Sequence, residues 1–205
     1  MHLRCKKVQL GGSIIKKNKL FLSSSLLFVS LLAVTSCNGN KKDALKEYTD
    51  KIDSSIVTIR RATIISSITE SSTLVYEKKT EIEITYVDNE ANGSVYSTIK
   101  KLGNDFKLVT SNERDSFNGS IVDAKLFNYK IDKDTLNSGY KITEGVLDAT
   151  VSQTNAKAFL NVSDTDVNGD ISFNVVLSEE KITSFRIAYK NISGRDVSIS
   201  AEYLY

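Results

Sequence analysis

The chain has 205 residues, with 27 Lys and Arg, 25 Asp and Glu, and a single His. Residues 1–36 hold six of the basic residues and none of the acidic ones, so residues 37–205 carry 21 basic and 25 acidic residues, a net charge of −4. Residues 37–205 also lack His, Trp, Pro and Met and contain one Cys, which excludes internal disulfides, cysteine nucleophiles, Ser-His-Asp triads and histidine metal sites, and nothing in this charge balance indicates nucleic-acid binding.

The first element is an apolar segment that follows a basic one. Lys16, Lys17 and Lys19 precede residues 20–34, LFLSSSLLFVSLLAV, after which the small residues Thr35 and Ser36 lead to Cys37. A charged region, a short apolar region and small residues in that order are typical of a secretory signal. The alternative, a membrane-spanning anchor helix, needs about 20 apolar residues. We therefore predict a signal peptide over residues 1–36.

The end of this segment, Val34-Thr35-Ser36-Cys37, resembles the lipobox of bacterial lipoproteins. The resemblance implies cleavage before Cys37, attachment of diacylglycerol to its sulfur and acylation of the new amino terminus, with no other cofactor. Two or more acyl chains anchor a protein stably. The expected location is the extracytoplasmic face of the cell membrane or cell envelope, with the membrane as a partner and residues 37–42 as lipidated cysteine and polar tether.

Residues 43–205 form the predicted single domain, which begins with a helix. Asp43 can cap the helix. Its apolar residues recur at spacings of three and four, which predicts one apolar stripe: Leu45, Tyr48, Ile52, Ile56 and Ile59. From Val57 onward β-branched residues accumulate and the helix end is ambiguous, so we expect strands from there to residue 205.

The middle of the domain alternates apolar and polar residues. Ile82, Ile84 and Tyr86 predict one strand, and residues 95–99 predict the returning strand after the turn VDNEANG. The next turn, LGND, leads to a strand that begins at Phe106 and Leu108. Further strands are expected at 74–76, 120–130 and 139–151, and residues 155–162 as a short helix or an irregular crossing.

The C-terminal third shows the clearest alternation, in three segments joined by the turns SEEK and NISGRD. This pattern predicts an antiparallel meander with one dry and one wet face. The dry positions are Ile171, Phe173, Val175, Leu177, Phe185, Ile187, Tyr189, Val197, Ile199, Ala201, Tyr203 and Tyr205.

The segment DTDVNGDISF (164–173) spaces its oxygen ligands as a calcium loop does: Asp164, Asp166, Asn168 and Asp170. A helix-loop-helix calcium site also needs a bidentate Glu at the twelfth position. That position is Val175, which the alternation assigns to the dry face of a strand. A turn of Asp, Asn and Gly needs no metal, because these residues bond their own backbone. We therefore predict a turn and no metal site, with a weak calcium loop as the alternative.

The sequence contains no catalytic motif such as G-x-S-x-G, S-x-x-K or a Gly-rich phosphate loop. We therefore expect a non-enzymatic protein. The fold class is α+β, mainly β, and the dry faces of about eight or nine strands need cover. A helix is ~10 Å across and strands lie ~4.8 Å apart, so one helix covers about two strands. The sheet is therefore expected to curve strongly into a half-barrel-like meander with an N-terminal helix.

This layout is similar to the LolA-type and LppX/LprG-type lipoproteins, whose curved half-barrels carry lipids, although no motif is shared. The resemblance implies a lipid or other hydrophobic ligand as partner. Its lining would come from the dry side of the C-terminal meander: Phe173, Val175, Phe185, Ile187, Ile199 and Tyr203. The alternative is a surface or envelope lipoprotein in which the same residues form a solid core and the domain makes protein or envelope contacts.

Overall fold

The computed structural model describes residues 41–87, 90–119, 126–136 and 139–205, with side chains from residue 44 onward. Contacts divide the chain into two compact units, residues 1–37 and 38–205, and every described residue belongs to the second. The predictions for the signal peptide, for Cys37 and for most of the tether therefore lie outside the described residues. Among the helices that are described, none is long and apolar enough to cross a membrane.

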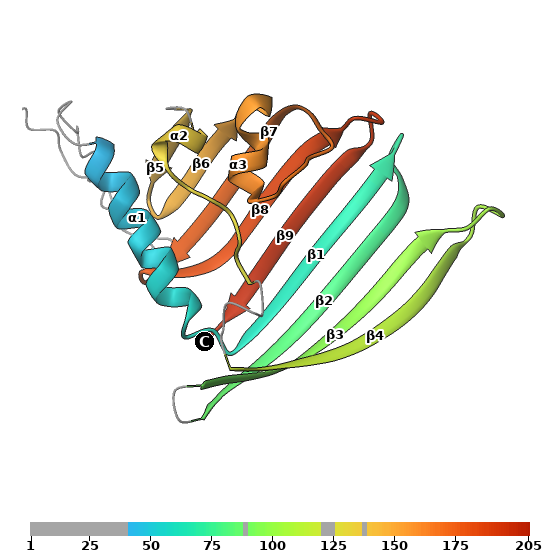
Figure 1. The fold of residues 1–205 in the computed structure, drawn as a ribbon, viewed down its shortest axis with the longest axis horizontal. Helices are drawn as coiled ribbons and strands as arrows, with labels where there is room; N and C mark the ends of the chain where they lie inside the picture. Colours follow the sequence, from blue (N-terminus) through green and yellow to red (C-terminus); the bar gives the residue numbers. More distant parts are fainter. Residues whose placement is uncertain (1–40, 88–89, 120–125, 137–138) are drawn as a thin grey trace, which may run out of the picture. The chain divides into compact units, whose positions relative to one another are not determined.

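Nine antiparallel strands form one sheet, in the order β4-β3-β2-β1-β9-β8-β7-β6-β5 (Figure 1). The prediction of a mainly β, antiparallel fold is confirmed. The two outer strands, β4 and β5, do not pair with each other, so the sheet is not closed into a barrel. In chain order the elements are α1 (Lys41–Ile56), β1 (Arg61–Glu70), β2 (Thr73–Val87), β3 (Glu90–Leu102), β4 (Leu108–Gly119), α2 (Lys133–Leu136), β5 (Tyr140–Thr143), β6 (Val146–Val151), η2 (Gln153–Asn155), α3 (Ala156–Leu160), β7 (Val167–Ser178), β8 (Lys181–Asn191) and β9 (Asp196–Leu204).

The sheet consists of two meanders, β1–β4 and β5–β9, that are joined where β1 pairs with β9. Two of its hairpins turn through Ser71-Ser72 and Glu179-Glu180, and all four residues have positive φ angles between 50° and 66°. Two successive residues with positive φ form the turn whose twist matches that of the flanking strands. The predicted C-terminal meander is confirmed as β7, β8 and β9, although β9 ends at Leu204, before Tyr205.

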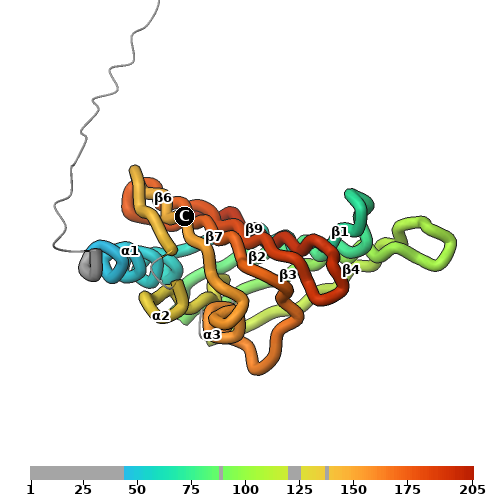
Figure 2. The backbone as a smooth tube through the Cα atoms, turned by 90° about the horizontal axis from the view of Figure 1, so that it is seen from above, coloured from blue at the N-terminus to red at the C-terminus, as the bar shows by residue number. Residues whose placement is uncertain are grey.

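The hydrophobic core lies on one face of β5–β9, which we call the core face, and the opposite side is the open face. Helices α1, α2 and α3 lie over this half of the sheet (Figures 1 and 2). Leu45, Tyr48 and Ile52 of α1 are buried, and the Tyr48 hydroxyl donates toward the carbonyl oxygens of Gly145 and Val175, at 2.9 Å from each. The apolar stripe predicted for the first helix therefore faces the sheet.

The strands β1–β4 form a part of the sheet that we call the wing, and no described helix lies over β2, β3 or β4 (Figure 1). Charged residues occur on both of its faces. On the core face Lys78 bonds Glu113 at 3.4 Å, and on the open face Lys100 bonds Glu77 at 2.8 Å. Cross-strand pairs of opposite charge stabilise a sheet without burial.

The polar wing explains why the argument from helix cover was wrong. That argument assumed a dry face on every strand, but apart from Ile99 the buried apolar side chains of the wing lie near Ile82, Ile84 and Ala91. The remainder needs no cover and leaves the sheet open. Two local predictions were also wrong: residues 126–130 form no strand, and Phe106 lies in the β3–β4 turn with φ 60°, before β4 begins.

Candidate interaction surface on the wing

The residues predicted to line a ligand cavity lie in the packed core. Phe173, Val175, Phe185, Ile187 and Tyr203 are buried, and Ile199 is half-buried against them. Aromatic rings from outside the sheet fill the space above them: the Phe159 ring lies 4.8 Å from that of Phe173, and the Tyr129 ring lies 5.1 Å from that of Phe185. The sequence indicated the right face of the sheet, but it did not reveal the segment that covers it.

The segment from Asp164 to Asp170 does not form the tight turn that was predicted. Strand β7 begins at Val167, and its pairing with β8 is irregular between Asn168 and Ser172, where Gly169 has φ 88°. A bulge inside a strand therefore accounts for the Asn and Gly. The Asp164 carboxylate forms an ion pair with Lys157 at 3.1 Å, and this hydrogen-bonded pair lowers the pKa of Asp164. In the described part of the chain, no group of three or more His, Cys, Asp or Glu side chains could hold a metal ion.

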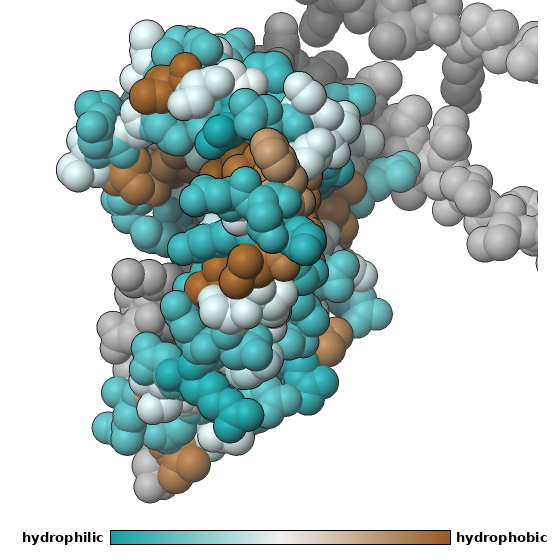
Figure 3. Space-filling view, turned by 90° about the vertical axis from the view of Figure 1, so that its right-hand side faces the viewer, coloured by the Kyte–Doolittle hydropathy of each residue, from teal (hydrophilic) through white to brown (hydrophobic). Residues whose placement is uncertain are grey.

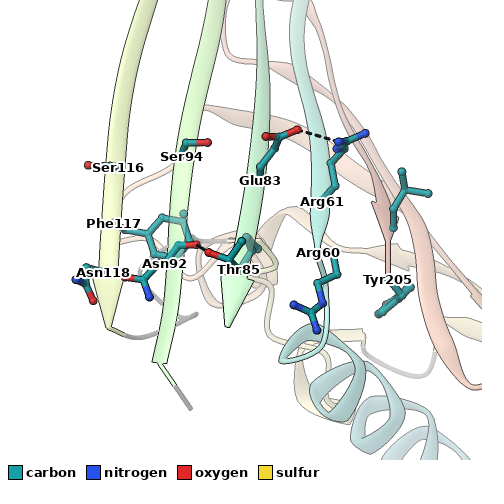
Figure 4. A pocket seen from close by; sticks show the side chains of 13 residues that line it. Arg60, Arg61, Glu83, Thr85, Asn92, Ser94, Ser116, Phe117, Asn118 and Tyr205 are labelled. Carbon is teal, nitrogen blue, oxygen red and sulfur yellow. Dashed lines mark hydrogen bonds and ion pairs between the residues drawn. The ribbon is translucent and has the colours of Figure 1, made fainter. Parts of the chain in front are cut away.

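A groove of about 830 Å³ crosses the wing at the end where β1 begins and β4 ends. Its polar side chains come from four neighbouring strands (Figure 4). Arg61 of β1 bonds Glu83 of β2 at 2.8 Å, and the Thr85 hydroxyl donates to the Asn92 carbonyl oxygen of β3 at 3.3 Å. Further polar side chains of the lining lie on β3 and β4, namely Ser94, Ser116 and Asn118, and Leu204 and Tyr205 line the groove beside β1.

One end of the groove is formed by Arg60, which lies over the ring of Tyr86 at 5.0 Å. The Tyr86 hydroxyl donates to the carbonyl oxygen of Ile59 at 2.9 Å. Burial raises the pKa of Tyr86, and the Arg60 guanidinium opposes that rise. The tyrosine is therefore neutral at physiological pH, and Arg60 provides the groove with a fixed positive charge.

The other end of the groove is formed by Phe117 of β4, whose ring covers Gly93 of β3. A Cβ atom at Gly93 would lie 2.0 Å from the ring, so only glycine leaves room for it. Gly93 and Phe117 are directly paired across β3 and β4. An aromatic ring packed over a cross-strand glycine fixes the register of the pair. The ring therefore holds the last part of β4 against β3.

The outer edge of β4 carries backbone groups that no described strand uses. The Gly103 N–H donates to the Lys107 carbonyl oxygen at 2.8 Å, and the next pair is Leu102 with Leu108. Antiparallel ladders alternate bonded and non-bonded pairs, so the odd-numbered residues of β4 bond β3 and the even-numbered ones point outward. A second bond gives the same result. The Ile84 N–H donates to the Arg60 carbonyl oxygen, so even-numbered residues of β2 bond toward β1 and odd-numbered ones bond β3. Following the register from β2 through β3 then assigns the odd-numbered residues of β4 to bonds with β3.

This edge is long, regular and solvated. Every residue from Leu108 to Ser116 is exposed, and all twelve residues of β4 pair with β3 without a register shift. Seen from the right-hand side of Figure 1, the surface is mostly hydrophilic with separate hydrophobic groups (Figure 3). The β3–β4 hairpin carries exposed hydrophobic side chains of its own, since Phe106 is 85% and Val109 61% exposed.

The chemistry available on the wing is hydrogen bonding and charge recognition. The groove offers hydroxyl, amide and guanidinium groups, and the edge offers unpaired N–H and C=O groups. The sequence predicted the start of β4 but not its length, because residues 110–116 are polar on both faces and so lack apolar alternation. Thr110 is the one residue of this stretch that strands favour, and its Asn and Asp are types that strands disfavour.

No family model matches this chain, and no curated protein matches it. Among solved structures it has a likeness to a redesigned beta barrel, b11L5F_LGL, at 4% identity over 75% of this chain and 97% of that one, with a TM-score of 0.24. A second redesigned beta barrel, mFAP1 bound to DFHBI, has 7% identity over 71% and 94% of the two chains, with a TM-score of 0.22. These likenesses are weak and identify no family.

Proposed function

We propose that this protein is a lipid-anchored lipoprotein on the extracytoplasmic face of a bacterial cell membrane or envelope. Its β-domain acts as a non-enzymatic binding module that contacts other proteins through the wing. The anchor part of the proposal is supported by the sequence Val34-Thr35-Ser36-Cys37 and the signal-like segment before it. The contact part is supported by one observation: the wing carries a 12-residue outer strand that is almost wholly exposed and contributes little to the core.

The packing on the core face favours this function over ligand transport. A lipid carrier, with a strongly curved half-barrel, would need a cavity on the dry side of β7, β8 and β9. Phe127, Tyr129 and Phe159 occupy that side instead and contact Phe173 and Phe185 through their rings. Well-packed interiors leave few voids larger than a water molecule. A lipid adduct in native mass spectra of the purified chain would reverse this preference.

The anchor is tested by replacing its cysteine. We expect Cys37→Ala to abolish both lipid attachment and cleavage, because the sulfur is the acceptor of the diacylglyceryl group. Cells grown with labelled palmitate should incorporate label into the parent protein and none into the variant, which should accumulate at precursor length. Label of equal intensity on the variant would contradict the proposal.

The contact surface is tested by crosslinking in cells. A photoreactive phenylalanine analogue at Thr110, on the outer strand of the wing, is expected to give crosslinked products with other proteins. The same analogue at Thr150 of β6 is the matched control, because Thr150 is also an exposed threonine in a strand. Products of equal yield at both positions, or at Thr150 alone, would contradict a contact surface on the wing.

A further inference from the structure

We infer that the outer edge of β4 binds an extended segment of a partner protein whose side chains alternate basic and acidic, with the basic ones beside Glu113 and Asp115. This inference rests on the proposed function and adds the chemistry of the partner. An extended segment that joins an open sheet edge gains affinity from main-chain hydrogen bonds and specificity from its alternate side chains.

The main-chain part of the site consists of the residues whose backbone points outward: Leu108, Thr110, Asn112, Arg114, Ser116 and Asn118. One of their donors has a substitute partner, since the Ser116 N–H donates to the Asp115 carboxylate at 2.7 Å. An incoming carbonyl oxygen can take over this N–H. The carboxylate is then free to bind a cation, which is a basic side chain of the partner.

The side-chain part of the site is set by three consecutive charges. Glu113 and Asp115 lie on the core face of β4, and Arg114 lies on the open face. Lys78 neutralises Glu113 from the inner side at 3.4 Å, and Arg114 lies over the Tyr96 ring at 5.7 Å. A strand added outside β4 places its own side chains beside these groups, where opposite charges stabilise the pair.

A second copy of this chain is a poor occupant of the edge in the registers that bring its three charges face to face. In a two-fold symmetric antiparallel pairing, each residue faces one of the same parity, because the two sheets must share their faces. When the pairing is centred on Glu113, the two copies of Glu113 face each other. When it is centred on Asp115, the two copies of Asp115 do so. The register centred on Arg114 places Glu113 opposite Asp115 and pairs two arginines. Like charges directly opposite each other are destabilising.

An antiparallel partner runs opposite to β4, so the first residue of a nine-residue segment lies beside Phe117 and the last lies beside Val109. Apolar side chains suit the positions beside Phe117 and Val109, which are half-buried and exposed apolar residues. Basic side chains suit the positions beside Asp115 and Glu113, and an acidic one suits the position between them. The peptide VTKEKTSTV has this pattern, and VTEKETSTV reverses its three charges with the same β-forming residues.

The test measures fluorescence anisotropy of the two labelled peptides with the full chain purified in detergent. We expect VTKEKTSTV to bind and VTEKETSTV to bind roughly tenfold more weakly, because three favourable contacts become repulsive. The difference should shrink as salt is raised, since these charges are exposed. Equal binding of the two peptides, or binding of neither, would overturn the inference.

Two variants separate the main-chain and side-chain contributions. The isosteric double variant E113Q/D115N keeps the shape of the edge, and we expect it to lose most of the preference between the peptides and to keep only the part that Arg114 contributes. Thr110→Pro removes an outward N–H and no bond to β3, so the variant should fold and bind neither peptide well. Unchanged preference in the first variant, or unchanged affinity in the second, would also overturn the inference.

The remaining outcomes distinguish this inference from the proposed function. Sedimentation velocity should show a monomer, and a dimer that Thr110→Pro dissociates would assign the edge to a second copy and overturn the inference. If crosslinks form at Thr110 in cells but the peptides are not distinguished, the wing still contacts proteins and only the charge pattern is wrong. If neither is observed, both proposals fail.

Discussion

Tyr203 shows how a single polar atom connects the sheet to the segment that covers it. Its hydroxyl donates to the carbonyl oxygen of Leu126, and both residues are buried. Burial raises the pKa of Tyr203, and burial also raises the pKa of the nearby Tyr129 to about 12. Both hydroxyls are therefore held neutral in the folded protein, at pH values where exposed tyrosines ionise.

This arrangement predicts loss of stability at alkaline pH. Unfolded tyrosine has a pKa of about 10, so the stability is fully present below that pH and is lost as the pH rises through the higher folded values. For each such group the free energy of unfolding should fall by about 1.4 kcal/mol per pH unit above 10. Urea titrations between pH 7 and 11 should show a flat region followed by this fall.

Tyr203→Phe is the control for the alkaline prediction. It should lower the free energy of unfolding at pH 7 by about 1–3 kcal/mol, because the buried Leu126 carbonyl loses its donor. The alkaline fall should then become shallower, since one ionising group is gone. A variant as stable as the parent, with the same alkaline slope, would show that this hydroxyl does not hold the covering segment.

The strands differ in how much of their surface the rest of the domain protects. Strands β7 and β8 lie beneath α1 and α3 and carry five of the twelve largest fully buried side chains, whereas β4 is exposed along most of its length. Local opening free energies range from near zero to the value for global unfolding, depending on such burial. Amides of β7 and β8 should therefore exchange most slowly with solvent hydrogen.

Within β4, hydrogen exchange should alternate from residue to residue. The N–H groups of Val109, Ser111 and Glu113 bond β3 and should be protected by about 1–3 kcal/mol of local opening, while those of Thr110 and Asn112 point outward and should exchange almost freely. Amide exchange followed by NMR resolves neighbouring residues. Higher protection at Thr110 than at Ser111 would mean that the bonding alternation is assigned the wrong way round, and equal protection would mean that there is no alternation.

Across the whole domain, the sequence predicted the parts where burial and periodicity agree. The strands around Phe173, Phe185 and Tyr203 each have one dry face, and Leu45, Tyr48 and Ile52 repeat at helical spacing, so hydrophobic pattern and structure coincide there. Strand β4 has no dry face and was missed except at its start. Residues 126–130 were also predicted wrongly, because an irregular covering segment with Phe127 and Tyr129 has the composition of a strand.

The candidate surface was harder to predict than the core for the same reason. The groove residues Arg61, Glu83 and Asn92 are ordinary polar residues at strand positions, and only the register brings them together. The register between β1 and β2 depends on the turn at Ser71-Ser72, which has no Asn or Gly to mark it. Serine at positive φ is uncommon enough that the sequence gives little warning of it.

The pairing of β1 with β9 sets the order in which this domain can assemble. Arg61 pairs with Leu204, so the second strand partner of β1 is the last strand of the chain, whereas the other pairings join consecutive strands. A polypeptide that crosses a membrane through a secretion channel with its N-terminus first must stay unfolded until it has passed. In this topology the first meander cannot join the second until the final strand emerges. In the export that we propose for this chain, the late pairing delays the joining of the two meanders until β9 has emerged and leaves one side of β1 open to wrong partners during transit.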